Sequence, residues 1–188
     1  MSLPVVVGLT GASGAVYGVE AVRLLVEAGI EVHLVVTSAG EKVLRLELGL
    51  CPEQLGGGRP RLWPVDDIAA PIASGSFRTA GMLVAPCSIR TLSAVACSTS
   101  SNLLERAADV TLKERRPLVL LVRETPLHRG HVRLMLQASE AGAIIMPPVP
   151  AFYAGLQSIG DLVEQTTARA LDELGIDLGL VRRWTGAR

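Results

Sequence analysis

The sequence is short of cysteine and histidine, and each shortage argues against a class of protein. Its 188 residues contain three cysteines, Cys51, Cys87 and Cys97, an odd number without C-x-x-C spacing. This count argues against a disulfide framework and against a structural zinc site. The three histidines are too scattered to form a metal-binding motif. We therefore expect no metal.

An excess of charge of one sign is also missing. The 18 basic and 18 acidic residues cancel, so the charge balance does not predict nucleic acid or an anionic membrane surface as a partner. No apolar run approaches the roughly 20 residues that cross a bilayer, and the first residues lack the basic start of a secretion signal. We expect a cytoplasmic protein that binds neither nucleic acid nor membrane.

Apolar residues, by contrast, are plentiful. They make up 49% of the chain, whereas charged residues make up 19%. This balance indicates extra buried surface and suggests a large interface between subunits. The length of 188 residues fits one domain that spans residues 1–188.

Short apolar runs bounded by turn residues predict strands that are buried on both faces. There are five such runs, at 4–10, 31–37, 81–87, 117–124 and 142–148. Helical spacing lies between them, at 15–26 and 127–138, and Ser158 with Asp161 indicates a capping box that opens a final helix. The alternation predicts a doubly wound parallel α/β sheet. Residues 51–80 show neither helical nor strand periodicity over more than a few positions and are interpreted as an ordered surface loop.

Polar residues follow the predicted strands, at the edge where a parallel sheet binds ligands. In chain order they are Thr10, Gly11, Ala12 and Ser13, then Thr37 and Ser38, then Ser88 and Thr91, then Arg123 and Glu124. Hydroxyls, backbone amides and one arginine suit a phosphate and a polyhydroxyl chain. Each hydroxyl also has a simpler interpretation as a helix cap.

The glycine pattern narrows the choice of ligand. It is not G-x-G-x-x-G, no acidic residue follows the second strand, and no G-x-x-x-x-G-K-[ST] loop is present. NAD and P-loop nucleotide hydrolysis are therefore disfavoured. FMN fits better, because its ring needs close backbone approach at Gly11 and Gly14. Another phosphorylated ligand remains an alternative.

Several charged residues lie in or beside apolar patterns, where a charge must be paired or bind a ligand. They are Glu47, Arg106, Lys113, Arg123, Glu124 and Arg169. The cations, together with Tyr153, indicate a second anionic small molecule, and salt bridges between helices or subunits are the alternative. Cys87 is interpreted as a small buried residue rather than a nucleophile.

Five segments in fixed order resemble the flavin prenyltransferases of the UbiX family along nearly the whole chain. They are "GASGAVYG", "ASGSF", "PCSIRTLSAVA", "NLLERAADVTLKERRPLVLLVRETP" and "PPVPAFY". The resemblance implies a flavodoxin-like (Rossmann-like) three-layer α/β/α fold, bound FMN and a homododecamer. It also implies transfer of a dimethylallyl group from dimethylallyl monophosphate to N5 and C6 of reduced FMN, without metal, to make the cofactor of a UbiD-type decarboxylase.

The resemblance also implies roles for individual residues. The cofactor-binding residues would be Gly11, Ala12, Ser13, Thr37, Ser88, Ile89, Arg90, Thr91 and Arg123. Tyr153 and Arg169 would bind the prenyl phosphate, with Arg106 and Lys113 as further contacts, partly across subunits. The catalytic residues would be Ser13, Glu47, Lys113 and Glu124, with Glu47 and Glu124 handling protons. Departures from the family pattern at Ile68, 97–101 and Leu156 concern the shape of the prenyl pocket.

Two alternatives remain. A related flavin-dependent cysteine decarboxylase would need a histidine near the first turn and a Pro-x-Met-Asn motif, and this sequence has neither. An FMN carrier without catalysis would have little reason to keep Lys113, Glu124, Tyr153 and Arg169 together.

Overall fold

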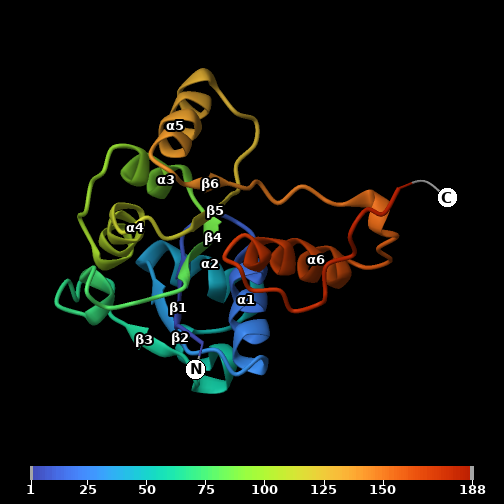
Figure 1. Cartoon of the computed structure of the whole chain (residues 1–188), viewed down its shortest axis with the longest axis horizontal. Coiled ribbons are helices and arrows are strands. Elements are labelled where there is room, and N and C mark those ends of the chain that lie inside the picture. The colour runs from blue at the N-terminus through green and yellow to red at the C-terminus, as the bar shows by residue number, and fades with distance from the viewer. Residues whose placement is uncertain (1, 187–188) are drawn as a thin grey trace.

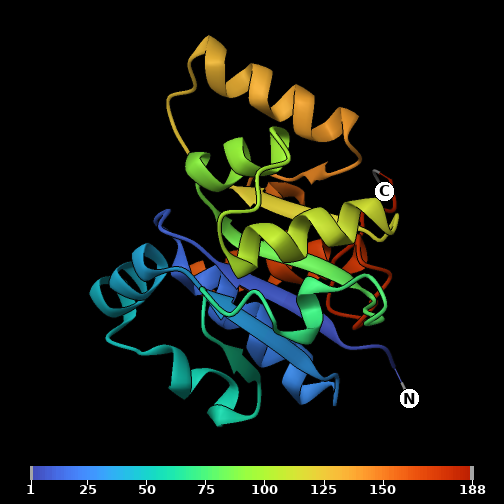
Figure 2. The same ribbon diagram turned by 90° about the vertical axis from the view of Figure 1, so that its left-hand side faces the viewer.

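A parallel sheet of six strands forms the centre of the molecule (Figures 1 and 2). The computed structural model describes residues 2–186. The strands are β1 (Val5–Leu9), β2 (Val32–Val36), β3 (Arg61–Trp63), β4 (Gly81–Cys87), β5 (Leu118–Val122) and β6 (Ile144–Ile145). Their order is β3-β2-β1-β4-β5-β6, with every pair parallel. The chain thus winds outward in both directions from β1 and β4, which confirms the doubly wound sheet.

Helices cover both faces of this sheet and make three layers. The helices are α1 (Ala15–Glu27), α2 (Ser38–Leu48), α3 (Ile89–Ala96), α4 (Leu103–Lys113), α5 (Arg129–Glu140) and α6 (Ile159–Asp172). On one face, α1, α2 and α6 pack on Val5, Val7 and Leu83, and on the other, α3, α4 and α5 pack on Val6, Met82 and Val84. Figure 1 shows α1 and α6 on one side of the strands and α3 and α4 on the other.

The strand predictions succeed where burial is complete. β1, β2, β4 and β5 are buried at every residue, so their sequences are apolar throughout rather than alternating. The predicted cap at Ser158 is also confirmed, because its hydroxyl oxygen accepts from the Asp161 amide at 3.1 Å. No helix in residues 2–186 is long and apolar enough to cross a membrane.

The stretch at 51–80 differs from the sequence interpretation. It contains the edge strand β3, which pairs with His33, Leu34 and Val35 of β2, and two short 3₁₀ helices, η1 (Pro52–Gly58) and η2 (Pro71–Ala73). A strand of two exposed residues and one half-buried residue carries no readable period, because its pairing depends on β2 rather than on its own pattern. At the other edge, the strand predicted at 142–148 shrinks to Ile144–Ile145.

Candidate functional site

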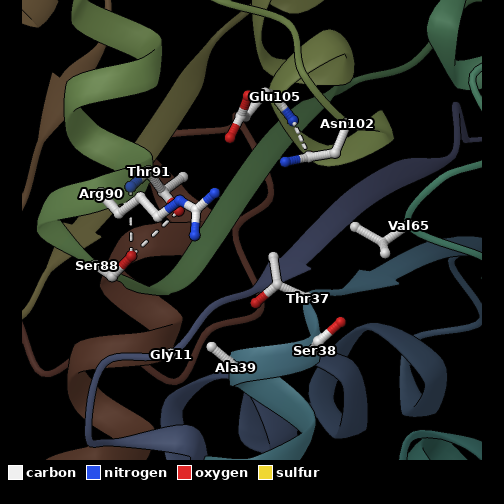
Figure 3. A pocket seen from close by; sticks show the side chains of 10 residues that line it. All are labelled: Gly11, Thr37, Ser38, Ala39, Val65, Ser88, Arg90, Thr91, Asn102 and Glu105. Carbon is white, nitrogen blue, oxygen red and sulfur yellow. Dashed lines mark hydrogen bonds between the residues drawn. The ribbon is translucent and has the colours of Figure 1, made fainter.

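A cavity of about 370 Å³ lies beyond the carboxyl ends of β1, β2 and β4 (Figure 3). This is the edge at which open parallel sheets bind ligands, and the volume is in the range of a small-molecule site. The lining residues are Gly11, Thr37, Ser38, Ala39, Val65, Ser88, Arg90, Thr91, Asn102 and Glu105. Of the predicted cofactor residues, Gly11, Thr37, Ser88, Arg90 and Thr91 are therefore brought together.

Three helices begin at this cavity. Thr37 caps α2 by accepting from the Gly40 amide at 3.0 Å, and Ser88 caps α3 by accepting from the Thr91 amide at 3.3 Å. Asn102 caps α4, its side-chain oxygen accepting from the Glu105 amide at 3.0 Å. Helix N-termini carry partial positive charge, and Arg90 adds a full one. Glu105 also lines the cavity, but its carboxylate accepts from the amide and the hydroxyl of Ser101. The part of the cavity at the starts of α2 and α3 therefore favours an anionic group such as a phosphate.

The floor of the cavity requires glycine at position 11. A Cβ added to Gly11 would lie 2.5 Å from Cβ of Ala39, so the loop after β1 and the start of α2 pack too closely for a side chain. Thr10, just before it, is buried and joins two strand ends. Its hydroxyl donates to the Pro86 carbonyl at 2.7 Å and accepts from the Ser88 amide at 2.8 Å. These contacts hold the loops after β1 and β4 in register.

Glu47 occupies the N-terminus of a fourth helix, α1, where a ligand anion would otherwise fit. Its carboxylate accepts from the amides of Gly14 and Ala15, both at 2.9 Å, and from the Ser13 hydroxyl. Gly14 stands in the left-handed region, with φ 103°, and supplies no side-chain cap of its own. Glu47, which α2 contributes, therefore completes the glycine-rich turn.

The electrostatics of this turn keep Glu47 ionised. Loss of water around the carboxyl alone would raise its pKa, but the hydrogen bonds from Ser13, Ala15 and Gly14, and the charge of Arg123, together lower the pKa below its usual value. The same arginine lies near Tyr17, whose burial raises the pKa of the phenol. Ser13, Glu47 and Arg123 thus form a cluster beside the cavity.

The other predicted residues near the strand ends lie outside the cavity lining. Ala12 is buried, and Ile89 is half-buried between Ser88 and Arg90. Glu124 is exposed after β5, and its carboxylate accepts from the Thr125 amide at 3.0 Å. Cys87 is fully buried, and burial raises the pKa of its thiol to about 12, as expected for a packing residue rather than a nucleophile.

The predicted prenyl-phosphate residues are dispersed within one chain, and none lines the cavity. On α4, Arg106 pairs with Asp109 at 2.9 Å, and Lys113 pairs with Glu114 at 2.5 Å. On α6, Arg169 pairs with Glu173 at 2.5 Å. Tyr153 lies in the short helix η3 (Phe152–Ala154) and is 56% exposed.

Asn102 and Glu105 are the polar lining residues that the sequence prediction missed, and the apolar lining residues Ala39 and Val65 were missed as well. The spacing N-x-x-E ahead of the α4 pattern is a helix-start signal, so the cap at Asn102 was readable. The position of Asn102 at the cavity could not be predicted, because α4 follows a loop whose path the sequence does not determine. Glu105 is buried, and its carboxylate accepts from the Ser101 amide at 2.9 Å.

The fold and the cavity define a class, the Rossmann-like flavoproteins, and residues 1–171 match the family described as Flavoprotein. The flavin prenyltransferase UbiX of Escherichia coli K12 is 52% identical over 185 residues, covering 97% of this chain and 98% of that protein. This chain belongs to the UbiX family of flavin prenyltransferases, which are enzymes.

Two solved structures are similar over nearly the whole chain. AnUbiX (PadA1), in complex with FMN and dimethylallyl pyrophosphate, has a TM-score of 0.95 and 42% identity and covers 100% of both chains. A dodecameric FMN-dependent Ubix-like decarboxylase from Escherichia coli O157:H7 has a TM-score of 0.92 and 40% identity, covering 98% of this chain and 100% of that one. The three-layer fold predicted from the sequence is confirmed.

Proposed function

We propose that this chain transfers a dimethylallyl group from dimethylallyl monophosphate to N5 and C6 of reduced FMN. The observation that carries the proposal is the cavity at which α2, α3 and α4 begin, in a chain half identical to a named flavin prenyltransferase. AnUbiX, its structural neighbour, was solved with FMN and dimethylallyl pyrophosphate. The product would serve a UbiD-type decarboxylase.

The residues of the cavity fit FMN. Thr37, Ser88 and Arg90 would hold the phosphate with the amides of the three helix N-termini. Gly11 lines the cavity and would place its backbone against the flavin, and Ala12, Ile89, Thr91 and Arg123 would complete the binding set. Bound and reduced, FMN supplies the nucleophilic atoms that accept the prenyl group.

The charged residues would act on the prenyl phosphate. Breaking the allylic carbon–oxygen bond leaves the electron pair, and hence growing negative charge, on the phosphate. Arg106, Lys113, Tyr153 and Arg169 would stabilise that charge without a metal. Formation of the second bond would add a proton to the prenyl double bond and remove one from C6, and Glu124 would accept the proton that C6 loses. Glu47 would take part through Ser13, whose hydroxyl donates to it.

Completing the site would require neighbouring copies of the chain. The side chains of Lys113 and Arg106 are partly exposed on α4 and Tyr153 is exposed, so these groups would be able to reach a phosphate held beside another subunit's cavity. A homododecamer like that of the Escherichia coli O157:H7 neighbour would bring them together. We further propose that residues 1–188 act as one flavoprotein domain in the cytoplasm, where the three free cysteines suit a reducing compartment.

Mass spectrometry of the extracted flavin tests the activity. The protein is incubated with FMN and dimethylallyl monophosphate under anaerobic reduction, and a flavin heavier by one dimethylallyl group is expected. Lys113→Met should slow its formation, whereas Lys42→Met, at an exposed position of α2, should not. Tightly bound but unmodified FMN would favour the non-catalytic carrier instead.

A further inference from the structure

The segment that carries Tyr153 has few contacts of its own. Between β6 and α6 the chain runs along the outside, with Val149 71% exposed and Phe152 83% exposed. Its backbone hydrogen bonds are local, such as Ala154 to Ala151 at 2.9 Å and Gly155 to Phe152 at 3.4 Å. In Figure 1 it lies well to the side of the sheet, next to the C-terminal residues. Local contacts of this kind do not determine where Tyr153 stands.

Arg182 joins this segment to the rest of the molecule. Its guanidinium donates to the carbonyls of Ala154 at 3.0 Å and Gly155 at 3.4 Å, directly after Tyr153. Among the described residues, these are the hydrogen bonds that tie 147–155 to a distant part of the chain. The ring of Trp184 also helps to hold Tyr153, because it packs edge-on against it with 5.7 Å between ring centroids.

Gln165 in turn holds Arg182. Its side-chain oxygen accepts from the Arg182 amide at 2.9 Å, and its side-chain nitrogen donates to the Arg182 carbonyl at 3.3 Å. Gln165 is only 5% exposed, so its position on α6 is determined by packing, and both of its polar groups are satisfied by one backbone residue. Arg169 lies one helical turn further along α6.

We infer that Gln165 and Arg182 are positioning residues that hold Tyr153 in a defined place relative to Arg169 of α6. Gln165 fixes the C-terminal segment to α6, and Arg182 fixes the Tyr153 segment to the C-terminal segment. This inference rests on the proposed function, in which Tyr153 and Arg169 bind the prenyl phosphate together. An exposed segment left free would lose the geometry that two ligands of one phosphate need.

Arg183 provides the matched control. It is the next residue and also a cation, but its guanidinium lies 2.8 Å from Asp172 and 3.2 Å from Asp177 and makes none of the hydrogen bonds to Ala154 and Gly155. Asp172 also lies 3.7 Å from Arg169, which keeps its closer partner Glu173 at 2.5 Å when Arg183 is replaced. We expect Arg182→Met and Gln165→Leu to raise KM for dimethylallyl monophosphate about tenfold, with kcat at saturation and Kd for FMN unchanged. Arg183→Met should keep the wild-type KM. An unchanged KM in Arg182→Met, or an equal rise in Arg183→Met, would overturn the inference.

Hydrogen exchange separates this inference from the proposed function. Amides of 147–158 should exchange faster in Arg182→Met than in wild type, and Arg183→Met should match wild type. If the wild-type protein does not prenylate FMN, the proposed function fails. The exchange rates alone then decide whether Gln165 and Arg182 hold the Tyr153 segment in place. Equal exchange in all three proteins would overturn the inference whatever the activity.

Discussion

The cavity and the C-terminal segment are built in opposite ways. The cavity lies at the ends of β1, β2 and β4, central strands buried at every residue, and its caps belong to helices packed on the sheet. Tyr153 follows the two-residue edge strand β6 and is exposed. In the proposed function, one chain would contain the cofactor half of the site, whereas the prenyl-phosphate half would depend on long-range ties and on neighbouring copies.

Complementation between subunits tests whether the two halves of the proposed site come from different copies, and the largest change in activity is expected here. Lys113→Met and Tyr153→Phe should each lower kcat on the order of a hundredfold, because each removes a donor to the leaving phosphate. Co-expression of the two variants with different tags should recover activity in mixed oligomers, since some sites then receive both intact side chains. Co-expression of two copies of one variant is the control, and a mixture as inactive as that control would show that each chain uses its own Lys113 and Tyr153.

A side chain at Gly11 should damage only the cavity half. In Gly11→Val the Cβ meets Ala39 at 2.5 Å, and the resulting displacement should cost about 3 kcal/mol of FMN binding, on the order of a hundredfold in Kd. Gly160→Ala is the control, because its Cβ would meet nothing closer than Ser158 at 3.5 Å. Quenching of flavin fluorescence measures both, and wild-type affinity in Gly11→Val would place the flavin elsewhere.

Removing the charge of Glu47 should weaken the turn beside the cavity. Glu47→Gln presents an amide to the N–H groups of Gly14 and Ala15. We expect the free energy of unfolding to fall by about 1 kcal/mol, a small value because the side chain is exposed. The expected fall in Tm is about 2–4 °C. Glu41→Gln, exposed on the same helix, should change Tm less.

The difference in stability between wild type and Glu47→Gln should depend on pH, which gives a second test of the Glu47 charge. The pKa of Glu47 is lowered in the folded protein, so its stabilisation is present above the ordinary pKa of 4.5 and is lost as the pH falls through the lowered value. The gap in stability between wild type and Glu47→Gln should therefore close in acid. A gap that persists there would mean that the carboxylate charge is not its source.

The smallest effect concerns His33, which supports the edge of the sheet next to the cavity. Burial lowers the pKa of its imidazole below 6.5, with Glu31 opposing and Arg61 adding to the shift, and its Nδ1 accepts from Trp63 at 3.0 Å. As the pH falls below 6.5 the unfolded chain binds more protons at this position than the folded protein does, so stability should fall between pH 7.5 and 5.5. Urea unfolding should show a flatter profile for His33→Gln, and parallel profiles would contradict the assignment.

Much of the cofactor half could be predicted from local pattern. Continuous apolar runs identified the four fully buried strands, and the polar residues directly after them included Thr37 and Ser88, which do line the cavity. The edge strand β3 was missed because three mostly exposed residues have no period. Asn102 was missed at the cavity because α4 follows a loop whose path the sequence does not predict. Arg106 and Lys113 lie seven positions apart on α4 and so share a helix face, but spacing cannot say what that face meets.

The sequence by itself determined the four fully buried strands, the helix caps and the family, because burial patterns and cap hydrogen bonds act between residues a few positions apart. Only the tertiary structure decided which of these residues meet. Thr10 reaches Ser88 across 78 positions, Glu47 reaches Gly14 across 33, and Arg182 reaches Ala154 across 28. Such contacts form only after the sheet has assembled and aligned its strand ends, so no local pattern encodes them.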